Sequence, residues 1–101
     1  MSRVIRVGAA QLGPIQLADT RGVVVDRMLA LMDDAHADGC TLVVYPELAL
    51  TTFFPRWDMS DPDEIDAFYE RGMPGPDTQP LFDRAKSYGI GFSFGYAELI
   101  E

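Results

Sequence analysis

The segment TLVVYP, residues 41–46, constrains the fold more than any other part of the sequence. It is an apolar run without the alternation of a half-exposed strand, which is typical of a strand in a parallel sheet covered on both faces. Pro46 cannot donate a ladder hydrogen bond, so strand pairing should end there. The run therefore predicts a buried strand that ends immediately before Glu47.

The residues before this run predict a strand and a helix. VIRVGAAQL, residues 4–12, is rich in β-branched and small apolar residues and closes at Gly13-Pro14, as a short strand followed by a turn does. Asp19-Thr20 offers N-cap chemistry, and Gly39 stands where a left-handed cap would end a helix. Apolar residues between these two ends fall on one helical face: Val24, Met28, Leu31 and Ala35.

The second half of the chain predicts a long loop, two helices and a third strand. Residues 48–62 mix aromatic, proline and polar residues without a clear period, which is typical of a functional loop. Asp61 or Asp63 can cap a short helix, and a second helix with an apolar face should end at Gly89. IGFSFGYAELI, residues 90–100, is strand-like, and its glycines suggest close approach of another backbone.

This order of elements predicts an α/β fold with right-handed βαβ units in a mostly parallel sheet. Nothing in the 101 residues supplies the second layer that such a sheet needs. We therefore expect the chain to be a piece of a longer protein, or to depend on a partner.

Charge and composition disfavour several classes of partner. The net charge of -8 disfavours nucleic acid and anionic membrane surfaces, which bind basic patches. The single cysteine, Cys40, excludes an internal disulfide framework, and no apolar run approaches the length of a membrane span. The N-terminus has no apolar signal-peptide core. We therefore expect a cytoplasmic protein without nucleic-acid or membrane partners.

Glu47 is the candidate catalytic residue. It directly follows the apolar strand, and active sites in open α/β sheets collect at the carboxyl ends of strands. Apolar neighbours on both sides would remove water from its carboxylate, which raises proton affinity and suits general acid or base work. The alternative is a strand-end glutamate that caps a turn or faces solvent, and position alone leaves both open.

The residues around Glu47 resemble the nitrilase superfamily of carbon–nitrogen hydrolases. VVYPELALTTFFPRW is similar to the segment that carries the glutamate of that family's Glu-Lys-Cys triad. VGAAQLGPI resembles its first strand, and MPGP…LFDRAKSYGIGFSFGYAEL resembles its helix and third strand. The combination of ELALTTFFPRW and FYERGMPGP is most similar to the N-carbamoyl-D-amino acid hydrolases, although Tyr45 stands where many relatives have Phe.

The resemblance implies a four-layer αββα sandwich, with residues 1–101 as the N-terminal portion of one domain that continues beyond residue 101. It implies hydrolysis of N-carbamoyl-D-amino acids to the D-amino acid, ammonia and carbon dioxide. Glu47 would be the base, and the cysteine nucleophile and the lysine would lie outside this chain. The resemblance implies a homo-oligomer, and neither a cofactor nor a metal.

Two alternatives remain open. The substrate could be a nitrile, a simple amide or a β-ureido acid, because most specificity residues would lie beyond position 101. The chain as given could also be a non-catalytic fragment or interaction module.

Other residues are weaker candidates. Phe53, Phe54 and Trp57, together with Arg56, follow Glu47 closely enough to wall a substrate pocket, but could equally be core or subunit-contact residues. Three further side chains are expected to be structural or solvated: Cys40 as a small buried residue, Lys86 on the polar side of its helix, and His36 on a helix surface.

Overall fold

The computed structural model describes residues 2–100, within which three parallel strands form one sheet in the order β1-β2-β3. The strands are β1 (Val7–Ala9), β2 (Leu42–Val44) and β3 (Gly91–Ser93). The apolar run around Val43 is therefore the central strand, paired in parallel on both sides. The α/β class and the parallel sheet expected from the sequence are confirmed.

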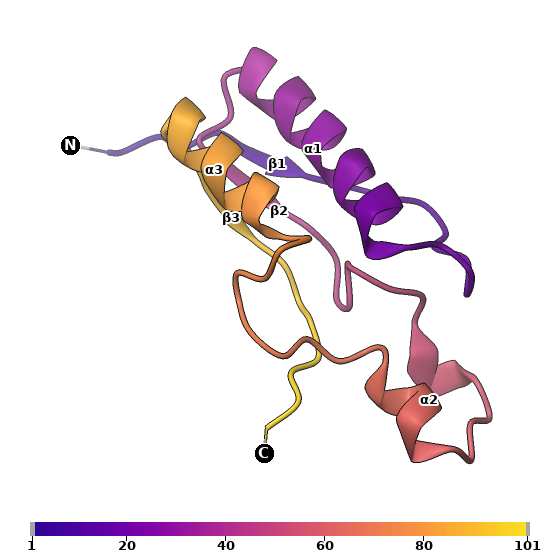
Figure 1. The fold of residues 1–101 in the computed structure, drawn as a ribbon. Helices are drawn as coiled ribbons and strands as arrows, with labels where there is room; N and C mark the ends of the chain where they lie inside the picture. Colours follow the sequence, from indigo (N-terminus) through magenta and orange to yellow (C-terminus); the bar gives the residue numbers. More distant parts are fainter. Residues whose placement is uncertain (1, 101) are drawn as a thin grey trace.

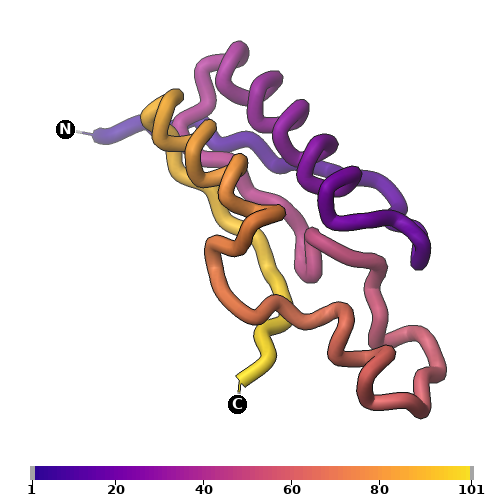
Figure 2. Tube along the Cα trace, in the orientation of Figure 1, coloured from indigo at the N-terminus to yellow at the C-terminus, as the bar shows by residue number. Residues whose placement is uncertain are grey.

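Two helices cover one face of this sheet. α1 (Arg21–Ala37) connects β1 to β2, α3 (Gln79–Tyr88) precedes β3, and Figure 1 shows both on the same side of the strands. Successive neighbouring strands joined by crossovers of one hand place their helices on one face, as here. The connection from β2 to α3 carries a 3₁₀ turn, η1 (Phe54–Arg56), and the short helix α2 (Pro62–Asp66). Figure 2 shows this connection extending away from the carboxyl ends of the strands.

The helix ends follow from local sequence chemistry. Thr20 caps α1, since its Oγ1 accepts from the Val23 N–H at 3.3 Å. Asp61 caps α2 by accepting from the Asp63 N–H at 3.0 Å. Gly39 and Gly89 follow α1 and α3 with φ of 80° and 68°, a left-handed conformation that glycine adopts without steric cost. These ends confirm the expected boundaries.

The core lies between the two helices and the inner face of the sheet. Val24 and Met28 of α1 are fully buried, as expected, whereas Leu31 and Ala35 are only partly buried. The buried face of α1 is wider than predicted because its side chains share one core with Val43 of β2 and Leu81 of α3. The largest fully buried apolar side chains come from both helices and from β2: Val24, Met28, Met32, Leu81 and Val43.

The outer face of the sheet is uncovered within the described residues. Val7 and Val44 are 51% and 40% exposed, although their neighbour Val43 on the inner face is fully buried. The expectation that the central strand is covered on both faces is therefore wrong for residues 2–100. The reason is that both helices lie on the inner side.

Regular pairing is shorter than the expected strands at residues 4–12 and 90–100. Beyond β1, the last pairing bond runs from the Ala10 N–H to the Val44 carbonyl (2.8 Å), after which the chain loses its partner at Pro46. Val4 lies before the paired segment and is 90% exposed. Beyond β3, Glu98 forms only an isolated parallel bridge with Glu70.

No helix within residues 2–100 is long and apolar enough to cross a membrane.

Candidate active site

Glu47 lies in a turn immediately beyond the carboxyl end of the central strand. The Tyr45 N–H still donates to the Ser93 carbonyl at 2.9 Å, so the chain remains paired with β3 up to that point. Beyond it, the Gly95 N–H donates to the Pro46 carbonyl (3.4 Å) and the Ala49 N–H to the Gly95 carbonyl (3.0 Å). The Glu47 turn is therefore held from the β3 side by hydrogen bonds on both sides of Glu47.

Leu48, next to Glu47, has an unusual backbone conformation. Its φ is 48°, in the left-handed region that costs a branched side chain on the order of 1–3 kcal/mol. Such a residue persists only where its surroundings over-determine its conformation. Here the hydrogen bonds to Gly95 supply that constraint, and they fix the direction in which the chain leaves Glu47.

A pocket of about 300 Å³ contains Glu47. It is formed by three segments: the loop after β1, the turn after β2, and the start of the long connection. Parallel strands bring their carboxyl ends to one edge of a sheet, which is why the first two segments meet. The lining residues are Leu12–Gln16, Pro46–Leu48, Thr51–Phe53 and Arg56.

The Glu47 side chain is exposed to solvent. The expected loss of hydration is therefore wrong for the chain by itself, because its apolar neighbours Ala49 and Leu50 turn inward into the core. A carboxylate that faces an open pocket is accessible to a ligand and to groups outside the described residues.

The three aromatic residues suggested as pocket walls lie in different environments. Phe53 lines the pocket with Glu47 and is 49% exposed. Phe54 is buried and packs on Phe68 and Tyr69, with ring centroids 5.4 and 5.5 Å apart. The Phe54 cluster packs the long connection against the residues that follow α2, so this side chain has a packing role in the described structure.

Trp57 contacts two residues that line the pocket but does not line it itself. Its Nε1 donates to Thr52 Oγ1 at 3.4 Å, and the Arg56 guanidinium lies 4.8 Å from its ring centroid. Both Thr52 and Arg56 line the pocket. Trp57 therefore supports two lining residues rather than being one of them.

Residues 6–100 match the family model of the carbon–nitrogen hydrolases. The chain belongs to the carbon–nitrogen hydrolase family. It is similar to a nitrilase of Paraburkholderia phymatum, with 29% identity over 103 residues, a match that covers 95% of this chain. The chain spans 29% of the length of that curated relative.

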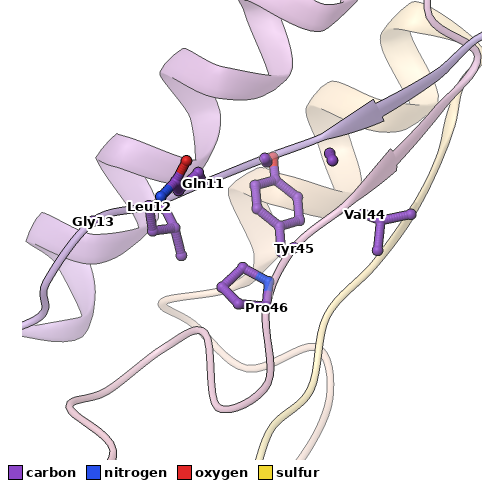
Figure 3. Close-up of a pocket in the computed structure, with 8 residues that line it drawn as sticks. Gln11, Leu12, Gly13, Val44, Tyr45 and Pro46 are labelled. Atoms are coloured by element: carbon purple, nitrogen blue, oxygen red, sulfur yellow. The ribbon is translucent and has the colours of Figure 1, made fainter.

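A second hollow of this carbon–nitrogen hydrolase chain, of about 570 Å³, adjoins the Glu47 pocket and shares Leu12, Gly13 and Pro46 with it. Figure 3 shows how residues 11–13, after β1, and residues 44–46, at the end of β2, border this hollow. The two hollows together follow the edge at which β1 and β2 end.

Tyr45 connects this edge to the helical layer. Its hydroxyl donates to the Met28 carbonyl of α1 at 2.6 Å, and the side chain is 5% exposed. Burial, with a smaller contribution from Asp33, raises the pKa of Tyr45 to about 12. The hydroxyl therefore stays protonated near neutral pH and acts as a structural donor, a role that a relative with Phe at this position lacks.

Glu70 is a buried carboxylate that sequence patterns did not single out. Arg21 Nε lies 2.8 and 3.1 Å from its two oxygens, and Arg21 Nη2 also donates to the Ala67 carbonyl (2.8 Å). Glu70 is also bridged through its backbone to the segment after β3, where its N–H donates to the Ala97 carbonyl at 2.6 Å. It ties three parts of the chain together away from the lining of the Glu47 pocket.

The remaining candidates have the environments expected for them. Cys40 is buried, with 8% of its surface exposed. Lys86 is exposed on α3. His36 is exposed at the end of α1 and stacks on Tyr88 with ring centroids 3.8 Å apart.

Proposed function

We propose that the protein containing this chain hydrolyses the C–N bond of N-carbamoyl-D-amino acids, with Glu47 as general base. The observation that carries this proposal is the position of Glu47: an exposed carboxylate beyond the central parallel strand, in a pocket shared with two other segments. Membership of the carbon–nitrogen hydrolase family supports the reaction class. The resemblance of ELALTTFFPRW and FYERGMPGP to N-carbamoyl-D-amino acid hydrolases supports the substrate class.

In the proposed reaction, Glu47 takes the proton of a cysteine thiol that lies outside this chain. The thiolate attacks the carbamoyl carbon, and a lysine, also outside this chain, stabilises the charge that develops on oxygen. Glu47 returns the proton to the departing amine, which leaves as the D-amino acid. Water activated by Glu47 then cleaves the carbamoyl thioester, and the carbamate decomposes to ammonia and carbon dioxide.

The exposed position of Glu47 supports its role as base for a thiol and a lysine that lie outside this chain. The side chain is exposed, so a thiol and an ammonium group can approach it. We place residues 1–101 at the N-terminal end of a single domain whose remainder brings these two groups. The proposal includes a homo-oligomer in the cytoplasm, a reaction without cofactor or metal, and no nucleic-acid or membrane partner.

Nitrile hydrolysis is the second candidate function. It is favoured by the similarity to the nitrilase of Paraburkholderia phymatum. The two candidates differ in the charge of the substrate, since an N-carbamoyl amino acid carries a carboxylate and a simple nitrile is neutral.

The decisive experiment is single-turnover kinetics on the full-length protein with N-carbamoyl-D-amino acids and, in parallel, with nitriles and simple amides. Glu47→Gln keeps the size of the side chain but cannot accept a proton, so acylation should slow by about 100-fold or more. Glu64→Gln makes the same change at an exposed position of α2 and should leave the rate unchanged. Acylation by Glu47→Gln within a few-fold of the parent would refute the role of Glu47, and turnover of nitriles alone would refute the substrate.

A further inference from the structure

We propose that Leu48 is a positioning residue for Glu47, because its left-handed backbone conformation keeps the carboxylate in the pocket. This inference rests on the proposed function of Glu47 and deepens it. It follows from the φ angle of Leu48, the change in burial on its two sides, and the contacts that Gly95 makes with the turn.

The backbone of Leu48 is unusual for its residue type. Within residues 2–100, Leu48 is the only residue other than glycine with a positive φ, and the angle is 48°. Glycine and asparagine adopt this conformation readily, whereas leucine seldom does. Backbone outliers of this kind cluster at functional sites, and this one directly follows the proposed base.

The left-handed residue separates an exposed carboxylate from a buried segment. Glu47 is exposed, whereas Ala49 and Leu50 are 0% and 2% exposed and belong to the core. In an extended strand, Glu47 and Ala49 would point to the same face, because side chains alternate along the chain. The turn at Leu48 separates them, so that Ala49 enters the core while Glu47 stays in the pocket.

The Leu48 side chain is less constrained than its backbone. It is only partly buried, it lines the Glu47 pocket, and it lies outside the core cluster of the described residues. What position 48 contributes is therefore the direction of the chain rather than apolar packing.

Gly95 transmits any change at Leu48 to Glu47. The Ala49 N–H donates to the Gly95 carbonyl at 3.0 Å, and the Gly95 N–H donates to the Pro46 carbonyl at 3.4 Å. Gly95 also packs directly against the backbone of Glu47 and Leu48, with no side chain between them. A residue that resists the left-handed conformation has little room to relax within the turn, so it must displace Glu47.

The test sets backbone preference against side-chain size in the full-length protein. Leu48→Ile keeps the apolar volume, but a β-branched residue resists the left-handed region, whereas Leu48→Asn and Leu48→Gly lose the volume and tolerate that region. With N-carbamoyl-D-amino acid as substrate, Leu48→Ile should lower kcat by about 10-fold or more, with KM within a few-fold of the parent. Leu48→Asn and Leu48→Gly should keep kcat within a few-fold.

Leu17 provides the matched control, since it is 45% exposed and does not line the Glu47 pocket. Leu17→Ile and Leu17→Asn should leave both constants unchanged. The opposite order at position 48, with an active Ile variant and inactive Asn and Gly variants, would overturn the inference, because it would assign Leu48 to apolar packing. Thermal unfolding checks that each variant folds, and loss of kcat in folded Asn and Gly variants overturns the inference even if the Ile variant does not fold.

A double-mutant cycle with Glu47→Gln gives a readout that a purely structural role would not move. Leu48→Ile should slow single-turnover acylation in the parent but add little in Glu47→Gln, because no base is left to position. Equal slowing in both backgrounds would overturn the inference. Unchanged acylation in Glu47→Gln alone would instead refute the proposed role of Glu47, and the role of Leu48 with it.

Discussion

Gly95 lies directly against the backbone of Glu47. A methyl group at position 95 would come within 3.1 Å of Glu47 Cα and 3.2 Å of the Leu48 nitrogen. Contacts this short force a shift, and here the atoms that must move are backbone atoms of the turn that carries the carboxylate. The glycines of residues 90–100 predicted close approach of another backbone. Gly95 confirms this prediction, and the backbone that it approaches is that of the Glu47 turn.

Gly95→Ala in the full-length protein should therefore lower kcat by about 10-fold or more, because displacing the proposed base, Glu47, by a fraction of an ångström is costly. Gly91→Ala is the matched control, since its nearest contacts would be ordinary ones at 3.5 Å and 3.9 Å. Steady-state kinetics, with thermal unfolding as a check on folding, separate the two variants. Equal activities would show that the position of Glu47 does not depend on Gly95.

Tyr45 should make stability depend on pH in the alkaline range. Its pKa is raised from 10.0 to about 12 in the folded state, so the unfolded chain releases this proton first as pH rises. Tyr45 therefore contributes about 3 kcal/mol to the free energy of unfolding, which is fully present below pH 10 and is lost between pH 10 and about 12.

Tyr45→Phe removes both this titration and the hydrogen bond to the Met28 carbonyl. At neutral pH the variant should be less stable by about 1 kcal/mol. The difference in unfolding free energy between parent and variant should shrink and change sign as pH rises from 10 to about 12. Urea unfolding of parent and variant between pH 10 and 12 tests this prediction. Stability profiles that stay parallel with pH would contradict the role of the Tyr45 hydroxyl as a buried donor.

Breaking the Arg21–Glu70 pair should cost more than breaking a surface pair. The side chains are 25% and 10% exposed, so Arg21→Met leaves a nearly buried carboxylate without its cation, at a cost of about 2 kcal/mol. Arg84→Met breaks a pair with Asp33 whose side chains are 40% and 42% exposed, which should cost about 0–1 kcal/mol. Denaturant unfolding of both variants measures these costs. Equal losses of stability would show that the burial of Glu70 does not increase the cost of breaking its ion pair.

The uncovered face of the sheet should bind hydrophobic dyes in the isolated chain. Val44 is 40% exposed at its centre, and Val44→Lys should reduce dye binding and self-association of residues 1–101. The same change should destabilise the full-length protein by several kcal/mol if the remaining domain covers this face. Val23→Lys, at a 47% exposed position of α1, is the control, and equal behaviour of the two variants would contradict a covered face.

The sequence was most informative where local chemistry decides the structure. Thr20, Gly39 and Gly89 set helix ends through caps and left-handed backbone, and these act over a few residues. The apolar run before Pro46 correctly indicated the central parallel strand. Within residues 2–100 only one of its two faces is covered, because coverage depends on where the helices pack, which the strand itself does not encode.

The candidate site was predictable in part. The position of Glu47 beyond a strand followed from Pro46, whereas the left-handed conformation of Leu48 has no signal in a leucine. The Arg21–Glu70 pair joins residues far apart in the chain, and neither belongs to a periodic pattern. The aromatic cluster around Phe54 could not be separated from a pocket wall, because burial and recognition use the same residue types.

The contact between Gly95 and Glu47 also orders events during synthesis. Everything before residue 90 can emerge from the ribosome while the turn after β2 lacks the hydrogen bonds that Gly95 gives it. The turn that carries Glu47 acquires its final geometry only when β3 has been made and has docked, a non-local step that closes a long loop. A nascent chain of this protein therefore carries Glu47, the proposed base, well before the turn around that residue can take its final conformation.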